Sequence, residues 1–337
     1  MEKIGLKNYN IGEIFIGFCI IRKKELKHKQ NGEPYLILEL GDKSGRLRSK
    51  IWREAKEYYE NLKVGQLLKI KGKIQSFLDT KELNVERLRL ARKDEISIEE
   101  IVPISKKDVQ FFKEQFQEHI EKIKNPYLNE LLNHIFPDIS AWDIYLKTPS
   151  GKLWHHNYLY GILEHIVCLL DLSDVMVKHY PIIQIDLLKT AIILHNLGKK
   201  IEYGYNGFID YTTEGRLIGH IVLGYQMVDE KIAEIDDFPD ELRLQLLHLI
   251  LSHQGSKEND APVVPMTLEA MVLHLMNELD VQANAFLRII ENDRLPDNSK
   301  WTRYNNLLNR FIYIGNEPEH NKDDEQNEKM DLKQKDN

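Results

Sequence analysis

The chain has 337 residues, of which 42% are apolar, so two domains with buried cores are expected. Its two cysteines, Cys19 and Cys168, argue against a disulfide framework and against a cysteine-based zinc site. The N-terminus lacks an apolar signal core and no apolar run approaches the roughly 18 residues of a membrane span, which predicts a soluble, cytoplasmic protein that does not act on a membrane.

The charges are distributed unevenly along the chain. Residues 1–96 contain 22 Lys or Arg and 14 Asp or Glu, a net of +8, whereas the remainder carries 24 and 39, a net of −15. A basic module joined to an acidic one is typical of a polyanion-binding part beside a cation-binding part. The alternative is a solvated charge distribution without a function.

Residues 1–96 are predicted to form an all-β domain. β-branched and aromatic residues alternate in five segments, and "NGEP" and "GDKSG" supply turns between them. Five strands with a helix before the fourth is the order of an OB-fold, a small barrel that often binds single-stranded nucleic acid. The predicted strands are residues 13–26, 34–42, 45–52, 66–77 and 81–90, with the helix at 54–62.

Binding a single strand requires cations for the phosphates and aromatic faces for the bases. The first hairpin and the third strand supply both. The candidate contacts are Arg22, Lys23, Lys24, Lys27, Tyr35, Arg48 and Trp52. Any one of the aromatic residues could equally pack in the core, so the prediction rests on the collective charge. An OB-fold can also serve as a protein-interaction module, and the sequence leaves that alternative open.

Residues 97–150 are predicted to form a helical connector, and residues 151–315 a helical domain. From "KKDVQFF" to about Ile314, apolar residues recur at helical spacing. The last residues, 316–337, combine many charges with almost no apolar content, which predicts a disordered tail. The predicted fold is therefore an N-terminal OB-fold barrel followed by an all-α bundle.

Five chemistry-bearing residues lie on five successive apolar segments of the helical part. They are His165, His195, His220, His253 and Asp280. A lone imidazole or carboxylate on such a helix is costly unless it is paired or ligated, and helical bundles build metal sites from inward-facing groups of this kind. A single histidine more often packs in a core, as we expect for His248 and His274. Ligation by histidine and carboxylate suits Mn²⁺, Fe²⁺, Zn²⁺ or Mg²⁺.

The order of these residues, with "HN" at 195–196, resembles the HD superfamily of metal-dependent phosphohydrolases. The whole chain is similar to the YhaM-type 3′–5′ exoribonucleases, which join an OB-fold to an HD domain. The matching phrases are "IKNPYLNELL", "HHNYLYGILEH", "LHNLGK", "YTTEGRLIGHI", "LSHQG" and "WTRYNNLLNR". The resemblance covers residues from about 8 to 312, and the order and spacing of these phrases make it specific.

The resemblance implies a site for two metal ions, with Mn²⁺ the expected activator. It implies that His165, His195 and Asp280 bind one ion and that His220 and His253 bind the second. Lys199 would contact the scissile phosphate. Arg216 and His156 are weaker candidates for contact with the phosphate or the leaving group.

The reaction that the resemblance implies is stepwise release of nucleoside 5′-monophosphates from the 3′ end of single-stranded RNA. Single-stranded DNA is an alternative substrate. Two other functions stay open: an HD phosphohydrolase acting on small nucleotides, and a non-enzymatic protein that binds single strands. The sequence also leaves a homo-oligomer open.

Asn196 is the main departure from the family pattern. This position belongs to both the metal site and the catalytic machinery, and the family has there an aspartate that bridges both ions. An amide oxygen is neutral and the amide NH₂ cannot ligate, so at least the second ion should bind more weakly. We therefore expect this chain to bind RNA but to cleave it slowly or not at all.

Overall fold

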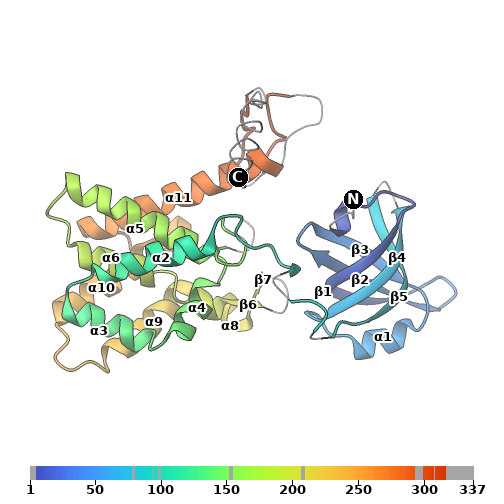
Figure 1. Cartoon of the computed structure of the whole chain (residues 1–337), viewed down its shortest axis with the longest axis horizontal. Coiled ribbons are helices and arrows are strands. Elements are labelled where there is room, and N and C mark those ends of the chain that lie inside the picture. Colours follow the sequence, from blue (N-terminus) through green and yellow to red (C-terminus); the bar gives the residue numbers. More distant parts are fainter. Residues whose placement is uncertain are drawn as a thin grey trace, which may run out of the picture. The chain divides into compact units, whose positions relative to one another are not determined.

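The computed structural model of the chain describes residues 5–77, 80–92, 94–97, 100–151, 155–205, 209–292, 299–306 and 308–315 (Figure 1). The chain divides into two compact units, Met1–Val281 and Gln282–Asn337. The first unit contains a five-stranded barrel and the helices that carry the candidate site. The predicted tail, residues 316–337, lies outside the described residues.

The N-terminal part is a closed barrel in which the strands follow the order β1-β2-β3-β5-β4. Strands β3 and β5 pair in parallel, and the other neighbours pair antiparallel. The elements are β1 (Ile14–His28), β2 (Pro34–Asp42), β3 (Gly45–Ile51), α1 (Ala55–Asn61), β4 (Leu67–Phe77) and β5 (Thr80–Leu90). Five strands with a helix before the fourth confirm the predicted OB-fold.

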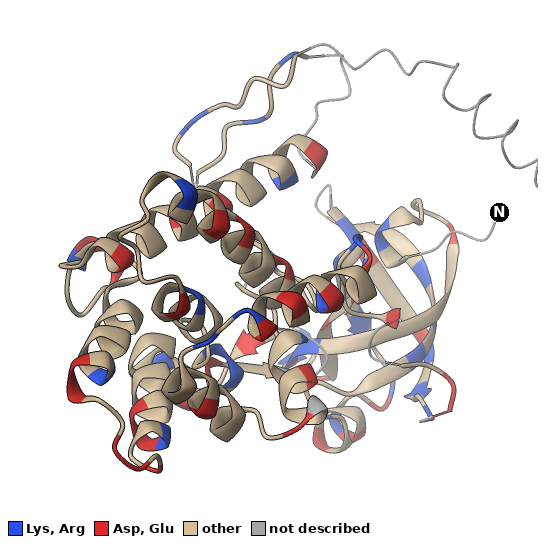
Figure 2. Ribbon diagram, turned by 60° about the vertical axis from the view of Figure 1, so that its left-hand side comes forward, with Lys and Arg blue, Asp and Glu red and all other residues tan. Residues whose placement is uncertain are grey.

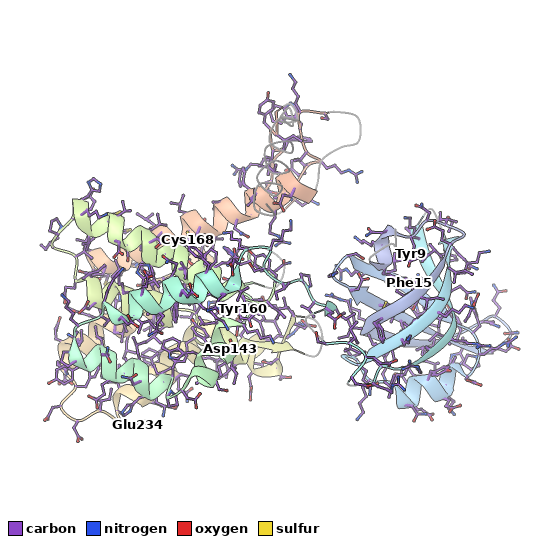
Figure 3. The ribbon with its side chains drawn as sticks, viewed as in Figure 1. Tyr9, Phe15, Asp143, Tyr160, Cys168 and Glu234 are labelled. Carbon is purple, nitrogen blue, oxygen red and sulfur yellow. The ribbon has the colours of Figure 1, made fainter. Side chains whose placement is uncertain are left out.

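The alternation along β4 shows why the barrel closes. Leu68, Ile70 and Ile74 are buried, whereas Lys71 and Lys73 between them are exposed. Because successive side chains of a strand point to opposite faces, this pattern directs the apolar residues inward and the lysines outward. The inner residues join a core that includes Phe15, against which the ring of Tyr9 packs edge-on (Figure 3).

The described residues from 109 to 292 are mostly helical. The helices are α2 (Val109–Glu121), α3 (Pro126–Ile135), α4 (Ile139–Leu146), α5 (Gly161–His179), α6 (Ile185–Leu194), α7 (Lys199–Glu202), α8 (Thr213–Ile218), α9 (His220–Ile232), α10 (Asp240–Ser252) and α11 (Leu268–Asn292). Every residue of α6 from Leu187 to Leu194 is buried, as expected for a helix that is apolar on all sides. Helix α6 therefore lies at the centre of the helical core.

Two parts of the predicted helical domain are not helical. Strands β6 (Tyr203–Tyr205) and β7 (Ile209–Tyr211) pair as a short antiparallel sheet. Beyond α11, the described residues up to 315 form isolated bridges, including Trp301 with Tyr313, where helix was predicted up to about Ile314. Both parts are rich in aromatic and β-branched residues, which favour extended pairing over helix.

None of the described helices joins sufficient length to sufficient apolar content to cross a bilayer. Both cysteines are free thiols: Cys19 is buried in the barrel and Cys168 is half-buried on α5.

Candidate metal centre and nucleic-acid surface

Four predicted histidines, each on or next to the end of a different helix, form a continuous row of imidazole rings. His165 lies on α5, His195 follows the last residue of α6, His220 opens α9 and His253 follows the last residue of α10. Their ring centroids are separated by 5.4 Å between His165 and His195, 4.9 Å between His195 and His253, and 5.7 Å between His253 and His220. The row is formed by residues up to 88 positions apart.

Two glycines allow the backbone segments of the site to approach closely. A Cβ atom on Gly198 would lie 2.0 Å from the carbonyl oxygen of His220 and 2.6 Å from the amide nitrogen of Gly224. A Cβ atom on Gly161 would lie 2.1 Å from the carbonyl oxygen of His156. The glycine of "HNLGK" is therefore needed because the turn after α6 packs directly against α9.

Each of the four histidines uses Nδ1 to contact an oxygen atom. The contacts are His165 with Asp280 Oδ2 at 2.7 Å, His195 with the Ile192 carbonyl at 2.7 Å, His220 with Glu202 Oε1 at 3.1 Å and His253 with the Ile250 carbonyl at 2.7 Å. Carbonyl and carboxylate oxygens only accept, so Nδ1 carries the proton in all four rings. The lone pair of each neutral ring is therefore on Nε2, as in histidines that ligate metals.

Among the described residues, the Nε2 atoms of His165 and His220 meet no proton donor. The Nε2 atoms of His165 and His195 lie 3.3 Å apart, so two lone pairs face each other. His220 Nε2 and Asn196 Oδ1 are buried, and neither has a hydrogen-bond partner among the described residues. Buried acceptors are normally satisfied, and here a cation would satisfy several of them at once. The residues present therefore fit a metal ion.

Burial sets the protonation states that such a site needs. It lowers the pKa of His165, His195, His220 and His253 below the ordinary value, which keeps the four rings neutral near pH 7. For Asp280, burial acts to raise the pKa, but hydrogen bonds from two histidines outweigh it and hold that pKa well below its ordinary value. Asp280 is therefore an ionised carboxylate.

The Asn196 side chain is buried within the row of imidazole rings. Its Nδ2 donates to His195 Nε2 over 2.7 Å, so the amide occupies the lone pair that a metal ion would need. Asn196 therefore departs from a ligand aspartate in two ways: it brings no charge, and its NH₂ group competes for His195.

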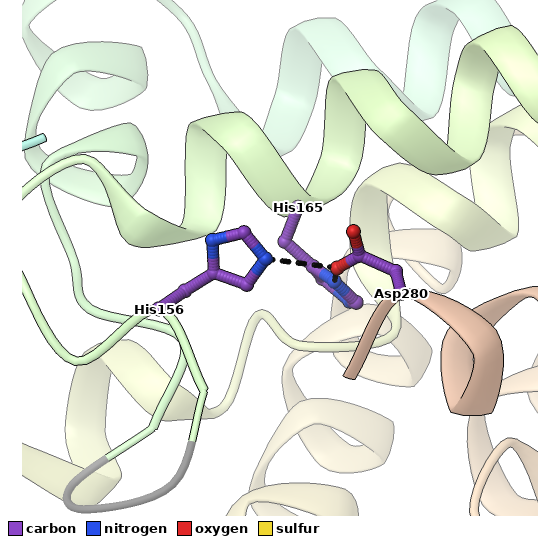
Figure 4. A group of neighbouring side chains, drawn as sticks. All are labelled: His156, His165 and Asp280. Carbon is purple, nitrogen blue, oxygen red and sulfur yellow. Dashed lines mark hydrogen bonds and ion pairs between the residues drawn. The ribbon is translucent and has the colours of Figure 1, made fainter. Parts of the chain in front are cut away.

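His156 lies beside the predicted metal ligands, in contact with Asp280 (Figure 4). The Asp280 Oδ2 atom is 2.9 Å from His156 Nε2 and 2.7 Å from His165 Nδ1, and the three residues could hold an ion. Nδ1 of His156 contacts the Tyr158 hydroxyl at 3.0 Å, and Tyr158 donates to Glu164 Oε2 over 3.1 Å. The sequence prediction missed Tyr158 and Glu164, because nothing in their spacing singles them out.

A cleft of about 640 Å³ opens beside the row of histidines. Its lining includes Lys199, His155, His220, Arg216 and Gln254. The Lys199 ammonium is buried and donates to the Ser150 carbonyl, and burial lowers the pKa of Lys199 to about 8. The structure thus brings Lys199 and Arg216, both predicted to contact phosphate, into the same cleft as the candidate ligand His220.

The histidines predicted to lie outside the site have ordinary partners. His248 Nε2 accepts from the Met266 amide over 2.9 Å, and His274 Nδ1 donates to the His253 carbonyl over 3.1 Å. Neither ring belongs to the row of four.

Most of the cations predicted to bind nucleic acid already have partners on the barrel. Arg22 is 3.6 Å from Glu39, Lys27 is 3.2 Å from Glu25 and Arg48 is 3.5 Å from Glu82. The two aromatic candidates, Tyr35 and Trp52, stack on each other with centroids 5.1 Å apart. Trp52 remains 43% exposed, with the Lys29 ammonium 5.3 Å from the centroid of its ring.

Lys24 has a structural contact that the sequence did not suggest. Its ammonium donates to the carbonyls of Tyr59 and Leu62 at the C-terminal end of α1, over 2.7 and 2.6 Å. A cation at this end of a helix satisfies carbonyls that have no partner within the helix. Its neighbour Lys23 is exposed.

We expect Lys24→Met to destabilise the chain by about 1 kcal/mol, because two hydrogen bonds from a charged donor are lost. Lys23→Met is the matched control and should leave the unfolding midpoint unchanged. Urea unfolding of both variants measures the difference. If Lys24→Met weakens RNA binding at unchanged stability, Lys24 contacts the ligand instead.

An OB-fold barrel together with a helical histidine and aspartate site defines a nucleic-acid-binding phosphohydrolase class. Residues 20–91 match the family of OB-fold nucleic acid binding domains, and residues 162–282 match the HD domain.

Two curated relatives extend over nearly the whole chain, and both are named 3′-5′ exoribonuclease YhaM. The protein from Listeria innocua serovar 6a is 32% identical over 318 residues, covering 93% of this chain and 98% of the relative. The protein from Halalkalibacterium halodurans is 29% identical over 318 residues, covering 93% of this chain and 96% of the relative. The chain belongs to the YhaM family of 3′–5′ exoribonucleases.

Proposed function

We propose that this chain is a metal-dependent 3′–5′ exoribonuclease that acts on single-stranded RNA, with single-stranded DNA as an alternative substrate, and that Asn196 attenuates its activity. The observation that carries the proposal is the row of four buried imidazoles that each use Nδ1 to donate, in which the Nε2 atoms of His165 and His195 face each other and His220 Nε2 has no partner among the described residues. Membership of the YhaM family supports the choice of reaction and polarity.

The residues that would hold the metal are those of the row and its neighbours. His165, His195 and Asp280 would hold one ion, and His220 and His253 a second, with Mn²⁺ as the proposed metal. When bound, divalent metal ions activate water and stabilise negative charge on a phosphodiester. Asn196 stands where the two ions would share a carboxylate.

The chain's own side chains complete the site. Asp280 and Glu202 accept from the Nδ1 atoms of His165 and His220, which fixes the orientation of both rings. Lys199 lines the cleft and its ammonium donates to the Ser150 carbonyl, which fixes the side chain in a position from which we expect it to contact a phosphate oxygen. Arg216 lines the same cleft and is held by Asp210 over 3.3 Å.

The test is shortening of a 5′-labelled single strand in the presence of Mn²⁺, with chromatographic identification of the products. We expect slow, EDTA-sensitive shortening from the 3′ end with release of nucleoside 5′-monophosphates. His253→Ala should reduce the rate about 100-fold or more, since it removes one of the imidazole ligands. His248→Ala, outside the row, is the control and should retain the rate of the parent.

A second function is favoured by one observation, the amide at position 196. A chain that binds single strands without cutting them would retain the barrel and the helical scaffold. The Asn196→Asp variant separates the two functions. If it also fails to shorten the strand while it binds Mn²⁺ and RNA, the exonuclease proposal is wrong.

A further inference from the structure

The outer face of β4 and β5 carries a basic ladder, formed by Lys69, Lys71, Lys73, Arg87 and Arg89. Lys71 lies directly opposite Arg87, and Lys69 lies directly opposite Arg89. Like charges opposite each other on antiparallel strands are destabilising. Lys and Arg of the barrel strands are blue in Figure 2.

Acidic neighbours compensate only one end of the basic ladder. Glu95 lies 2.6 Å from Arg89 and 3.7 Å from Lys69. Lys71, Lys73 and Arg87 are exposed, and within the described part of the chain none of them has an ion pair or a side-chain hydrogen bond. The barrel therefore keeps three uncompensated cations side by side, at a cost in stability.

Strand β1 borders the basic ladder with exposed apolar side chains. Ile16 pairs with Lys71 and Ile14 pairs with Lys73 in the register of β1 and β4. The two isoleucines are 59% and 52% exposed. A groove of about 320 Å³ runs over this face and is lined by Ile16, Lys69, Ile70, Lys71, Arg87, Leu88 and Arg89. A single-stranded nucleic acid can place its phosphates against such cations and its base faces against the neighbouring apolar side chains.

We propose that the basic ladder binds the phosphates of a single-stranded nucleic acid, with Ile14 and Ile16 against its sugars or bases. Charge complementarity favours this ligand. Lys71, Lys73 and Arg87 can bind phosphates without losing an ion pair within the described part of the chain. By contrast, Arg22, Lys27 and Arg48 on the predicted surface are each already paired with a carboxylate. The inference rests on the proposed function in one respect: the bound single strand is taken to be the strand that the helical domain cleaves.

The test uses Lys71→Glu in the full chain and a fluorescent RNA of about 20 nucleotides, with EDTA present so that no cleavage occurs. We expect Kd to rise about tenfold and the slope of log Kd against log salt to fall by about 0.7, the share of one phosphate contact. The unfolding midpoint should stay equal or rise, since the new carboxylate faces Arg87 and replaces a repulsion. Weaker binding without lost stability separates ligand contact from damage to the barrel.

Two control variants carry the same change of charge. Lys63→Glu, on the exposed loop after α1, reports the effect of net charge alone. Lys27→Glu, in the first hairpin, tests the surface predicted from the sequence. The basic ladder is supported if Lys71→Glu weakens binding well beyond both controls.

Three outcomes would overturn the inference. The first is unchanged binding by Lys71→Glu while Lys27→Glu loses it, which would place the strand on the hairpin. The second is a shift of Lys71→Glu to a smaller species on gel filtration at unchanged RNA affinity, which would make the ladder a protein interface. The third is a parent chain that binds no single strand. Loss of cleavage with intact binding, in contrast, contradicts only the proposed function.

Discussion

Replacing Asn196 by aspartate is expected to raise the affinity for Mn²⁺ about tenfold or more, which is the usual effect of one additional contact at a metal site. The rate of strand cleavage is expected to rise about 100-fold or more. The reason lies in two atoms of the amide. Nδ2 donates to His195 Nε2 and so occupies a ligand lone pair, and Oδ1 is buried without a partner. A carboxylate removes the competing donor and adds a negative charge where cations would bind.

The metal-free variant should show the opposite effect on stability. A carboxylate at this buried position, next to the lone pair of His195, is unfavourable until a cation neutralises it. We therefore expect a lower unfolding temperature than the parent in EDTA and a larger increase on adding Mn²⁺. Calorimetric titration with Mn²⁺ measures the affinity independently of catalysis.

Asn196→Ala is the matched control, because it frees His195 Nε2 without adding charge. A gain in Mn²⁺ affinity with alanine would assign the defect to the competing NH₂ group. A gain with aspartate alone would assign it to the missing charge. If neither variant differs from the parent in Mn²⁺ affinity, residue 196 does not limit metal binding.

Lys199→Met is expected to stabilise the chain by about 2–3 kcal/mol at pH 7 and to reduce cleavage about 100-fold. Burial lowers the pKa of Lys199 from 10.5 to about 8, so the unfolded chain holds this proton more tightly than the folded one. The ammonium therefore costs stability at all pH values below 8. This cost fades as the pH rises from 8 toward 10.5, where both states lose the proton.

Urea unfolding at pH 7 and at pH 10 tests both the size and the sign. The parent should gain stability relative to Lys199→Met as the pH rises. Lys200→Met, one residue along α7, is the control and should show neither the stabilisation nor the loss of cleavage. A Lys199→Met variant that cleaves normally would remove Lys199 from the phosphate-binding role.

The fold class followed from local patterns. Period-two alternation predicted the barrel strands, and helical periodicity predicted helix across the part of the chain that holds α5, α6, α9, α10 and α11. Each of these periodic patterns can be recognised within a single segment, because a strand buries one face and an amphipathic helix buries one stripe of its surface. The β6–β7 hairpin escaped prediction because three-residue strands are too short to show a period.

The residue types of the candidate site could also be read from the sequence. Histidines and an aspartate stand out on apolar helices because burying them alone is unfavourable. Asn196 was also recognised from the sequence, because the family that the chain resembles has an aspartate at this position. The chain order alone, however, says nothing about which nitrogen of each histidine carries the proton.

The tertiary structure decided what depends on contacts between distant segments. Glu202 and Asp280 determine the tautomers of His220 and His165 from 18 and 115 residues away, and the amide of Asn196 determines whether His195 is free. Packing of α1 against β1 occupies Lys24, and the register of β4 with β5 places Lys71 opposite Arg87. Composition thus determined that the barrel is basic, while strand register and helix packing determined which of its cations remain free to bind.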